Sequence, residues 1–242
     1  MDTENEQKNN EKKPKKKRGF LFYLAILLIL GGLSVLAYPL ILRMYSNYAN
    51  GVAQKNIDAQ LSTSSLSEYE QVDSNNLATA SPDGQMPWEM EDGEIGTDID
   101  FNFTQADAVI QIQKINLKVS VFNADTLKAM YPNMRKGASF YPKFNLPGKI
   151  GNVCIAAHRT GSSDYFLELD KLTKGDEIYI HTSDASYLYI VEYVTTVMPN
   201  DWSLLKQTNY AALTLSTCQA YEGVSNGKRL IVRAKLEKIR EN

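Results

Sequence analysis

The segment ALTLSTCQAYEG, residues 212–223, joins an alternating apolar and polar run to Cys218 and then to a polar stretch that contains Gly. Alternation with a period of two is typical of a half-buried β-strand, and the composition after it is typical of a turn. Similar short runs, rich in Val, Ile and Tyr, extend from VIQIQ (109–113) to RLIVRAKLEKI (229–239). Many strands with few, short helices predict a mainly β fold, either a closed barrel or a sandwich.

An apolar segment, residues 20–42, directly follows a block of basic residues. Its 23 residues would form a helix of about 34 Å, longer than the ~30 Å hydrocarbon core of a bilayer. A buried globular helix and a cleaved signal peptide are the alternatives. A signal peptide has an apolar region of only about 7–15 residues and a small-residue cleavage site. We therefore expect one N-terminal transmembrane helix.

The charge of the chain is unevenly distributed. Residues 1–18 carry seven Lys/Arg and four Asp/Glu, whereas the whole chain has a net charge of −2. Basic residues before a membrane helix place that side in the cytoplasm, so residues 43–242 are expected outside the cell. A nucleic-acid binder would carry its basic residues on the folded part, so no nucleic-acid partner is expected.

Three reactive side chains stand at the ends of predicted strands. His158 ends the run NVCIAAH (152–158), Cys218 follows LTLST, and Arg229 begins the last strand. A thiolate attacks a carbonyl to form a thioester, His exchanges protons near neutral pH, and Arg stabilises a developing oxyanion. The three types together suit acyl transfer. A plainer interpretation remains open: a small buried Cys, a surface His and a solvated Arg.

Three motifs in this order resemble the sortases, the cysteine transpeptidases of the Gram-positive cell surface. TLSTC (214–218) matches their TLxTC signature. AAHRTG (156–161) resembles the motif around their essential His, with Ala157 where Gly is usual. GKRLIVRA (227–234) resembles the segment that carries their essential Arg, and its first Arg is Arg229.

The resemblance implies an eight-stranded β-barrel with short helices, preceded by the transmembrane helix. It implies that Cys218 attacks an LPxTG-like sorting signal of a secreted protein and passes the acyl group to an amine. That amine would be the cell-wall precursor lipid II or a pilin lysine. His158 would be the acid/base, Arg229 would stabilise substrate and oxyanion, and Thr217 would help shape the substrate groove.

The expected organisation of the chain follows from these features. The segment after the membrane helix is rich in Ser, Asn and acidic residues and lacks periodicity, which is typical of a linker. The expected parts are a cytoplasmic basic tail (1–19), a transmembrane signal anchor (20–42), an extracellular stalk or linker (43–104) and a sortase catalytic domain (105–242).

Two branches of the family resemble this chain. The segments LPGKIGNVCIAAHRTG (146–161) and MPNDWSLL (198–205) resemble class D enzymes, towards which the prediction leans. Class C remains the alternative, because HRTGSSDYFLELDKLTKGD (158–176) is close to the His loop of that class. Met86-Pro87-Trp88 is the only lid-like piece and lacks the Asp of class C lids.

Other reactive residues favour structural roles. Cys154 shares a strand face with His158 and could approach the site, but it is expected to be a small buried core residue. A disulfide to Cys218 is not expected, because it would block the nucleophile. Arg159 is expected to be a solvated loop residue, with guidance of the substrate as the alternative. Arg233 is the second candidate for the catalytic Arg, and His181 is expected to be structural or exposed.

No cofactor is expected, although calcium activation is left open. The acidic residues at 89–100, with Glu168 and Asp170, lack a regular calcium-loop pattern. Two alternatives to the transpeptidase are a sortase-like binding module without turnover and another cysteine peptidase or L,D-transpeptidase. TLSTC is unlike the Ser-x-Gly-Cys type motif of L,D-transpeptidases, and papain-like enzymes place Cys before His.

Overall fold

The computed structural model describes residues 19–63, 70–71, 106–142, 144–161, 163–221 and 224–241. The chain forms two compact units, Met1–Leu40 and Ile41–Asn242. Helix α1 (Phe20–Thr63) begins in the first unit and ends in the second. Its segment Phe22–Ala59 is long and apolar enough to cross a membrane, by length and composition. This helix agrees with the predicted N-terminal span.

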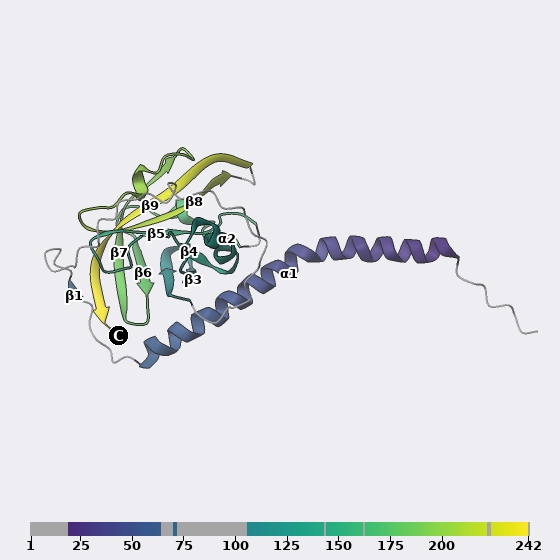
Figure 1. The fold of residues 1–242 in the computed structure, drawn as a ribbon, viewed down its shortest axis with the longest axis horizontal. Coiled ribbons are helices and arrows are strands. Elements are labelled where there is room, and N and C mark those ends of the chain that lie inside the picture. The colour runs from purple at the N-terminus through teal and green to yellow at the C-terminus, as the bar shows by residue number, and fades with distance from the viewer. Residues whose placement is uncertain are drawn as a thin grey trace, which may run out of the picture. The chain divides into compact units, whose positions relative to one another are not determined.

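The second unit is a closed barrel of eight strands (Figure 1). Neighbouring strands pair in the order β9-β7-β6-β2-β3-β4-β5-β8, and β8 pairs again with β9, which closes the ring. A two-residue strand, β1 (Glu70–Gln71), adds to β9. The barrel strands are β2 (Ala108–Ile112), β3 (Leu117–Phe122), β4 (Ala138–Phe140), β5 (Gly151–Ala156), β6 (Glu177–His181), β7 (Ala185–Val197), β8 (Ala211–Tyr221) and β9 (Val224–Glu241). This ring confirms the predicted eight-stranded barrel.

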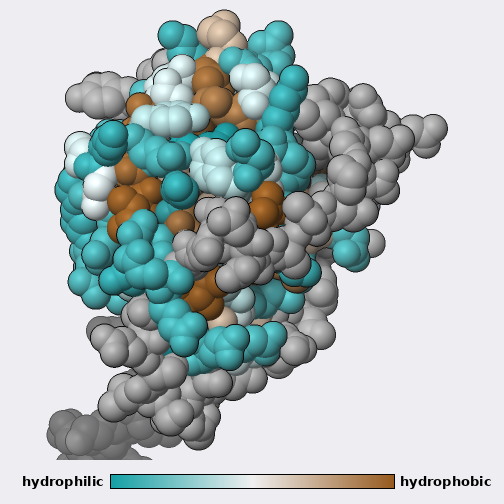
Figure 2. Space-filling model, turned by 90° about the vertical axis from the view of Figure 1, so that its left-hand side faces the viewer, coloured by the Kyte–Doolittle hydropathy of each residue, from teal (hydrophilic) through white to brown (hydrophobic). Residues whose placement is uncertain are grey.

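Alternate residues of each strand fill the barrel. In β8, Leu213 and Leu215 belong to the main core cluster, and in β9 Leu230 and Val232 belong to it. Because successive side chains of a strand point to opposite faces, the intervening residues of β8 and β9 face outwards. The outer surface is mainly hydrophilic on the face seen in Figure 2, where hydrophobic residues form several separate areas.

The helical elements beside the barrel are short. Helix α2 (Leu127–Lys136) begins after Thr126, whose hydroxyl accepts a hydrogen bond from the Ala129 amide at 3.2 Å. Such an N-cap satisfies one of the free amides of the first turn. Met130 of α2 packs against Ala156 at the end of β5. The 3-10 turns are η2 (Gln113–Ile115), η3 (Leu169–Lys171) and η4 (Ser203–Leu205).

The C-terminal part of α1 covers an open edge of β3. Strand β4 pairs with β3 only at Val121 and Phe122. Ahead of that pairing, the Asn50 side chain accepts a hydrogen bond from the Ser120 amide at 2.8 Å, and Gln54 donates one to the Lys118 carbonyl at 2.9 Å. These contacts satisfy backbone groups that an edge strand otherwise leaves open.

Apolar packing supports the same contact. Ala53 and Ile57 of α1 form a cluster with Ala106, Val109 and Phe122. Residues 43–63 of the predicted linker are therefore helical, and their last turns are part of the folded unit. The remainder of that linker, apart from the short β1, lies outside the described residues, as do the lid-like segment 86–88 and residues 1–18.

Candidate active site

The ends of two parallel neighbouring strands carry His158 and Cys218. Ala156 of β5 pairs with Ser216 of β8, and each reactive residue comes two positions later in its chain. Val153, Ile155 and Ala157 face the core, as do Leu213 and Leu215. By alternation, His158 and Cys218 belong to the outer face at the same end of the barrel. The structure therefore brings the predicted nucleophile and acid/base to adjacent strand ends.

Arg229 lies directly opposite Cys218. The two residues are partners in the antiparallel pair of β8 and β9. Arg229 Nη1 donates a hydrogen bond to Cys218 Sγ at 3.0 Å, and both side chains are half-buried. Hydrogen bonds from a guanidinium strengthen when the acceptor carries a negative charge. This contact would therefore stabilise a thiolate at Cys218.

His158 is half-buried at the start of the loop after β5. Burial lowers its pKa below the usual value, and the nearby positive charge of Arg135 lowers it further. The imidazole is therefore mainly neutral at neutral pH. Its backbone carbonyl accepts a hydrogen bond from the Phe166 amide at 3.0 Å, which joins the far part of the loop to its first residue. Among the described residues, no hydrogen bond joins the His158 ring to Cys218.

Thr217 is buried, with 3% of its surface exposed. Its hydroxyl donates to the Ala157 carbonyl at 2.8 Å, and the Ala157 amide donates to the Ser216 carbonyl at 3.4 Å. Thr217, the residue before Cys218, is therefore bonded directly to Ala157, the residue before His158. Its contribution to the shape of the substrate groove stays a prediction.

The expectation of a solvated Arg159 is wrong. Only 5% of its surface is exposed. It forms an ion pair with Asp170 at 2.9 Å, and it donates to the Leu167 carbonyl and to Gln219 Oε1, both at 3.2 Å. The guanidinium thus braces the loop that follows His158. Sequence reasoning missed this because the loop folds back over its own first residues, which no local pattern shows.

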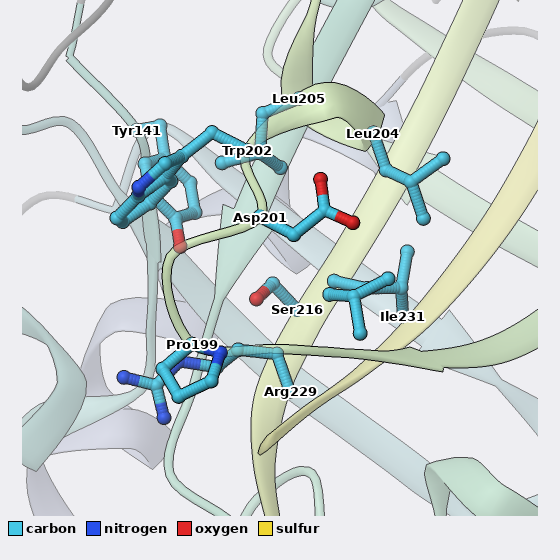
Figure 3. Close-up of a pocket in the computed structure, with 10 residues that line it drawn as sticks. Tyr141, Pro199, Asp201, Trp202, Leu204, Leu205, Ser216, Arg229 and Ile231 are labelled. Carbon is cyan, nitrogen blue, oxygen red and sulfur yellow. The ribbon is translucent and has the colours of Figure 1, made fainter. Parts of the chain in front are cut away.

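A small pocket adjoins Arg229 (Figure 3). One side is formed by the loop between β7 and β8, and the floor is formed by side chains of the strands. Its lining residues are Tyr141, Val197, Pro199, Asp201, Trp202, Leu204, Leu205, Ser216, Arg229 and Ile231. Except for Arg229, these residues were not singled out from the sequence as site residues. The stretch MPNDWSLL was the available signal, since it supplies five of them.

Two ionisable groups of the pocket have shifted pKa values. Burial raises the pKa of Tyr141 to about 12, although a hydrogen bond with Ser216 opposes the shift. Hydrogen bonds from the Ser203 side chain and amide lower the pKa of Asp201. At neutral pH the pocket therefore contains a neutral phenol and a carboxylate beside the Arg229 guanidinium.

The remaining candidates take structural positions. Cys154 is fully buried and is not in a disulfide, as predicted, and burial raises its pKa. Arg233 has 4% of its surface exposed and donates to the Leu204 carbonyl, so it is not at the Cys218 thiol. His181 Nδ1 lies 2.8 Å from Ser186 Oγ, and burial lowers the pKa of His181 to about 4.

A metal site is not evident in the part of the chain that the structure describes. No group of three or more His, Cys, Asp or Glu side chains gathers there. Glu168 pairs with Lys171 at 2.6 Å, and Asp170 pairs with Arg159. The acidic segment 89–100 lies outside the described residues, so calcium independence stays a prediction.

The barrel fold agrees with comparisons to known proteins. The sortase domain family model matches residues 110–237, more than half of the chain, and the chain therefore belongs to the sortase family.

Two curated relatives are named sortase A. That of Bacillus anthracis is 30% identical over 128 residues, which cover 52% of this chain and 58% of the relative. That of Listeria monocytogenes is 28% identical over 130 residues, which cover 53% of this chain and 55% of the relative. The chain thus spans a little over half the length of both.

A crystal structure of sortase E1 from Streptomyces coelicolor, with a tripeptide in its active site, gives a TM-score of 0.50 at 22% identity. The match covers 57% of this chain and 91% of that one. At this identity the likeness supports the fold alone. The assignment to class D, with class C as its alternative, stays a prediction.

Proposed function

We propose that this protein is a membrane-anchored cysteine transpeptidase that cleaves an LPxTG-like sorting signal and transfers the acyl group to an amine. The hydrogen bond from Arg229 Nη1 to Cys218 Sγ at 3.0 Å carries this proposal most directly. It places a permanent positive charge beside a free, half-buried thiol at the rim of a rigid barrel. Nucleophilic cysteines are typically found beside such charges.

The first half of the reaction forms a thioester. Neutral His158 accepts the thiol proton of Cys218, and the sulfur attacks the carbonyl carbon of the Thr in the signal. Arg229 stabilises the oxyanion of the tetrahedral intermediate. The C–N bond to Gly then breaks, and the imidazolium of His158 gives its proton to the departing amine. The products are an acyl-enzyme and a peptide with a new N-terminal Gly.

The second half transfers the acyl group. An amine, from lipid II or from a pilin lysine, attacks the thioester carbonyl and loses a proton to His158. The C–S bond breaks, the thiolate takes up the proton from His158, and a new amide bond forms. A low pKa of His158 supports both halves, because the imidazole must be neutral when each nucleophile approaches.

The pocket beside Arg229 is the proposed place for the sorting signal. It combines apolar walls, such as Trp202 and Ile231, with the guanidinium that would hold the carbonyl next to the scissile bond. Small-molecule and peptide sites typically combine apolar surface with a few directed polar groups. Secreted proteins with a C-terminal signal of this kind are the proposed partners.

The proposed location is the cell membrane. The apolar part of α1 would cross the bilayer once, with the basic N-terminal segment in the cytoplasm and the barrel outside. We also propose that no metal is required, and EDTA should therefore leave the rate unchanged.

The test is a peptide assay with the full chain in detergent. A peptide with an LPxTG-like signal and an amine acceptor should give a ligated product, and mass spectrometry should detect a Cys218 thioester. Cys218→Ala should give neither. Product from Cys218→Ala would overturn the assignment of the nucleophile. Signal binding without any thioester, together with a Cys218 thiol that alkylates no faster than a free cysteine, would instead identify a binding module.

A further inference from the structure

The loop that roofs the pocket is held from beneath by buried side chains. We define the roof loop as residues 198–210, which connect β7 to β8 and contain η4. The Leu204 carbonyl accepts from Asn152 Nδ2 at 3.2 Å, from Thr214 Oγ1 at 3.5 Å and from Arg233 Nη2. These three residues belong to three different strands, β5, β8 and β9.

Asn152 forms most of its hydrogen bonds with the roof loop or with Thr214 beneath it. Its Nδ2 also donates to the Lys206 carbonyl at 3.1 Å, and its backbone amide donates to Gln207 Oε1 at 2.8 Å. Its Oδ1 accepts from Thr214 Oγ1 at 2.8 Å. Asn152 has no exposed surface. The two bonds of its Nδ2 therefore hold the roof loop, and the bond of its Oδ1 joins β5 to β8 beneath that loop.

The burial of Arg233 is a second, independent indication that side chains of the strands hold the roof loop. It is 4% exposed, and among the described residues its Nε and Nη1 atoms have no hydrogen-bond partner. Burial of a guanidinium is costly unless its donors are used. Its one hydrogen bond goes to the Leu204 carbonyl. Among the described residues, the Leu204 carbonyl of the roof loop is therefore the hydrogen-bond acceptor of this buried guanidinium.

The attached carbonyl lies within the wall of the pocket. Leu204 and Leu205 line the pocket from the roof loop, opposite Ser216 and Ile231 on the strands (Figure 3). Leu205 is only 4% exposed, so its side chain is packed inward. Movement of the Leu204 carbonyl would therefore change the width of the pocket.

We propose that Asn152 and Arg233 are positioning residues that hold the roof loop in the shape that receives the sorting signal. They act through the Leu204 and Lys206 carbonyls and do not touch the substrate. The pocket is then preformed, and the signal does not have to order its own wall. This inference rests on the proposed function, because it assumes that the pocket receives the signal.

The test compares Arg233→Met, which removes the donor, with Arg233→Lys, which keeps a donor to Leu204. Lys235→Met is the matched control, because Lys235 is an exposed cation on the same face of β9. Steady-state assays with the signal peptide should give a KM for Arg233→Met raised about tenfold or more, a loss of about 1.4 kcal/mol, with kcat within about twofold. Arg233→Lys should recover most of this loss, and Lys235→Met should match the wild type.

Asn152→Asp is a second variant, which keeps the side-chain shape but removes both amide donors. It should also raise KM. The rate of Cys218 alkylation by iodoacetamide should stay unchanged in all variants, since this small reagent does not need the pocket. An unchanged KM with only a lower melting temperature would reduce these residues to structural ones. Slower alkylation would show that they act on Cys218 itself.

Hydrogen exchange separates this inference from the proposed function. In Arg233→Met, the amides of Leu205 and Lys206, which close the η4 turn, should exchange faster than in the wild type, while those of β8 and β9 do not. If the wild type shows no turnover of any signal peptide, the proposed function fails. Hydrogen exchange then still tests whether Arg233 holds the roof loop. Unchanged protection of residues 198–210 in Arg233→Met would show that Arg233 does not hold it.

Discussion

The hydroxyl of Thr217 donates a hydrogen bond to the carbonyl of Ala157 at 2.8 Å. This bond joins the strand that presents Cys218 to the segment that presents His158. Thr217→Val should leave a buried carbonyl without its partner and lower the free energy of unfolding by about 1–3 kcal/mol. It should also lower kcat, because the two reacting groups lose a fixed separation.

Thr217→Ser is the control for that change, since it keeps the hydroxyl. It should retain most of the stability in urea unfolding and most of kcat. A Thr217→Val protein with wild-type kcat would show that this bond does not set the geometry of the site.

Replacement of Arg229 should affect the chemical step. Arg229→Ala removes the donor to Cys218 Sγ and should lower kcat/KM by about 10²–10³-fold, the usual effect of removing one oxyanion donor. Alkylation of Cys218 by iodoacetamide at neutral pH should also slow, since the thiolate loses its neighbouring charge. Arg233→Ala should leave the alkylation rate unchanged. Equal losses of alkylation rate in both variants would contradict the separate roles given to these two arginines.

Stability should decline as the pH falls below neutral. Burial lowers the pKa of His181 from 6.5 to about 4, and that of His158 is also lowered. Between pH 6.5 and 4 the unfolded chain therefore binds protons that the folded chain does not. The free energy of unfolding therefore decreases as the pH decreases. Urea unfolding from pH 7.5 to 4 should show this decline, and His181→Asn should make it shallower. A pH dependence that is the same in His181→Asn would show that other groups cause the decline.

The packing of α1 on the barrel should contribute to stability. Ile57 is 3% exposed and lies in a cluster with Val109 and Phe122. Ile57→Ala should lower the free energy of unfolding by about 2–5 kcal/mol. Lys55→Ala, at an exposed position of the same helix, should stay within about 0.5 kcal/mol of the wild type. If both variants unfold alike, this part of α1 does not belong to the folded unit.

Local alternation predicts a mainly β fold and the strand-end positions of the site but leaves a barrel and a sandwich open. The resemblance to the sortases selects the eight-stranded barrel. Residues 213, 215, 230 and 232 face the core, so the parity of Cys218 and Arg229 follows directly. The motifs add which of the outward residues react. Alternation places Cys154 on the outward face with His158, so its predicted burial depended on its residue type and on the need for a free Cys218. The structure buries it beneath the roof loop, where its thiol donates to the Leu205 carbonyl.

Local alternation does not show which outward residues are covered. Arg233 has the spacing of an outward residue, yet the roof loop buries it, and Arg159 is buried by the loop that it begins. The path of the roof loop depends on contacts between residues far apart in the chain, such as Asn152 with Leu204. The same reason explains why the last turns of α1 looked like a linker. Their partners are on β2 and β3, more than forty residues later.

Strand β9 pairs with β7 on one side and with β8 on the other, and it carries Arg229. A chain in which β9 has not yet paired has an open sheet and a cysteine without its neighbouring cation. Closure of the fold and assembly of the site are therefore one event. During folding, Cys218 would meet the positive charge of Arg229 only once the barrel is complete, so the thiol of a partly folded chain would react less readily with carbonyl groups.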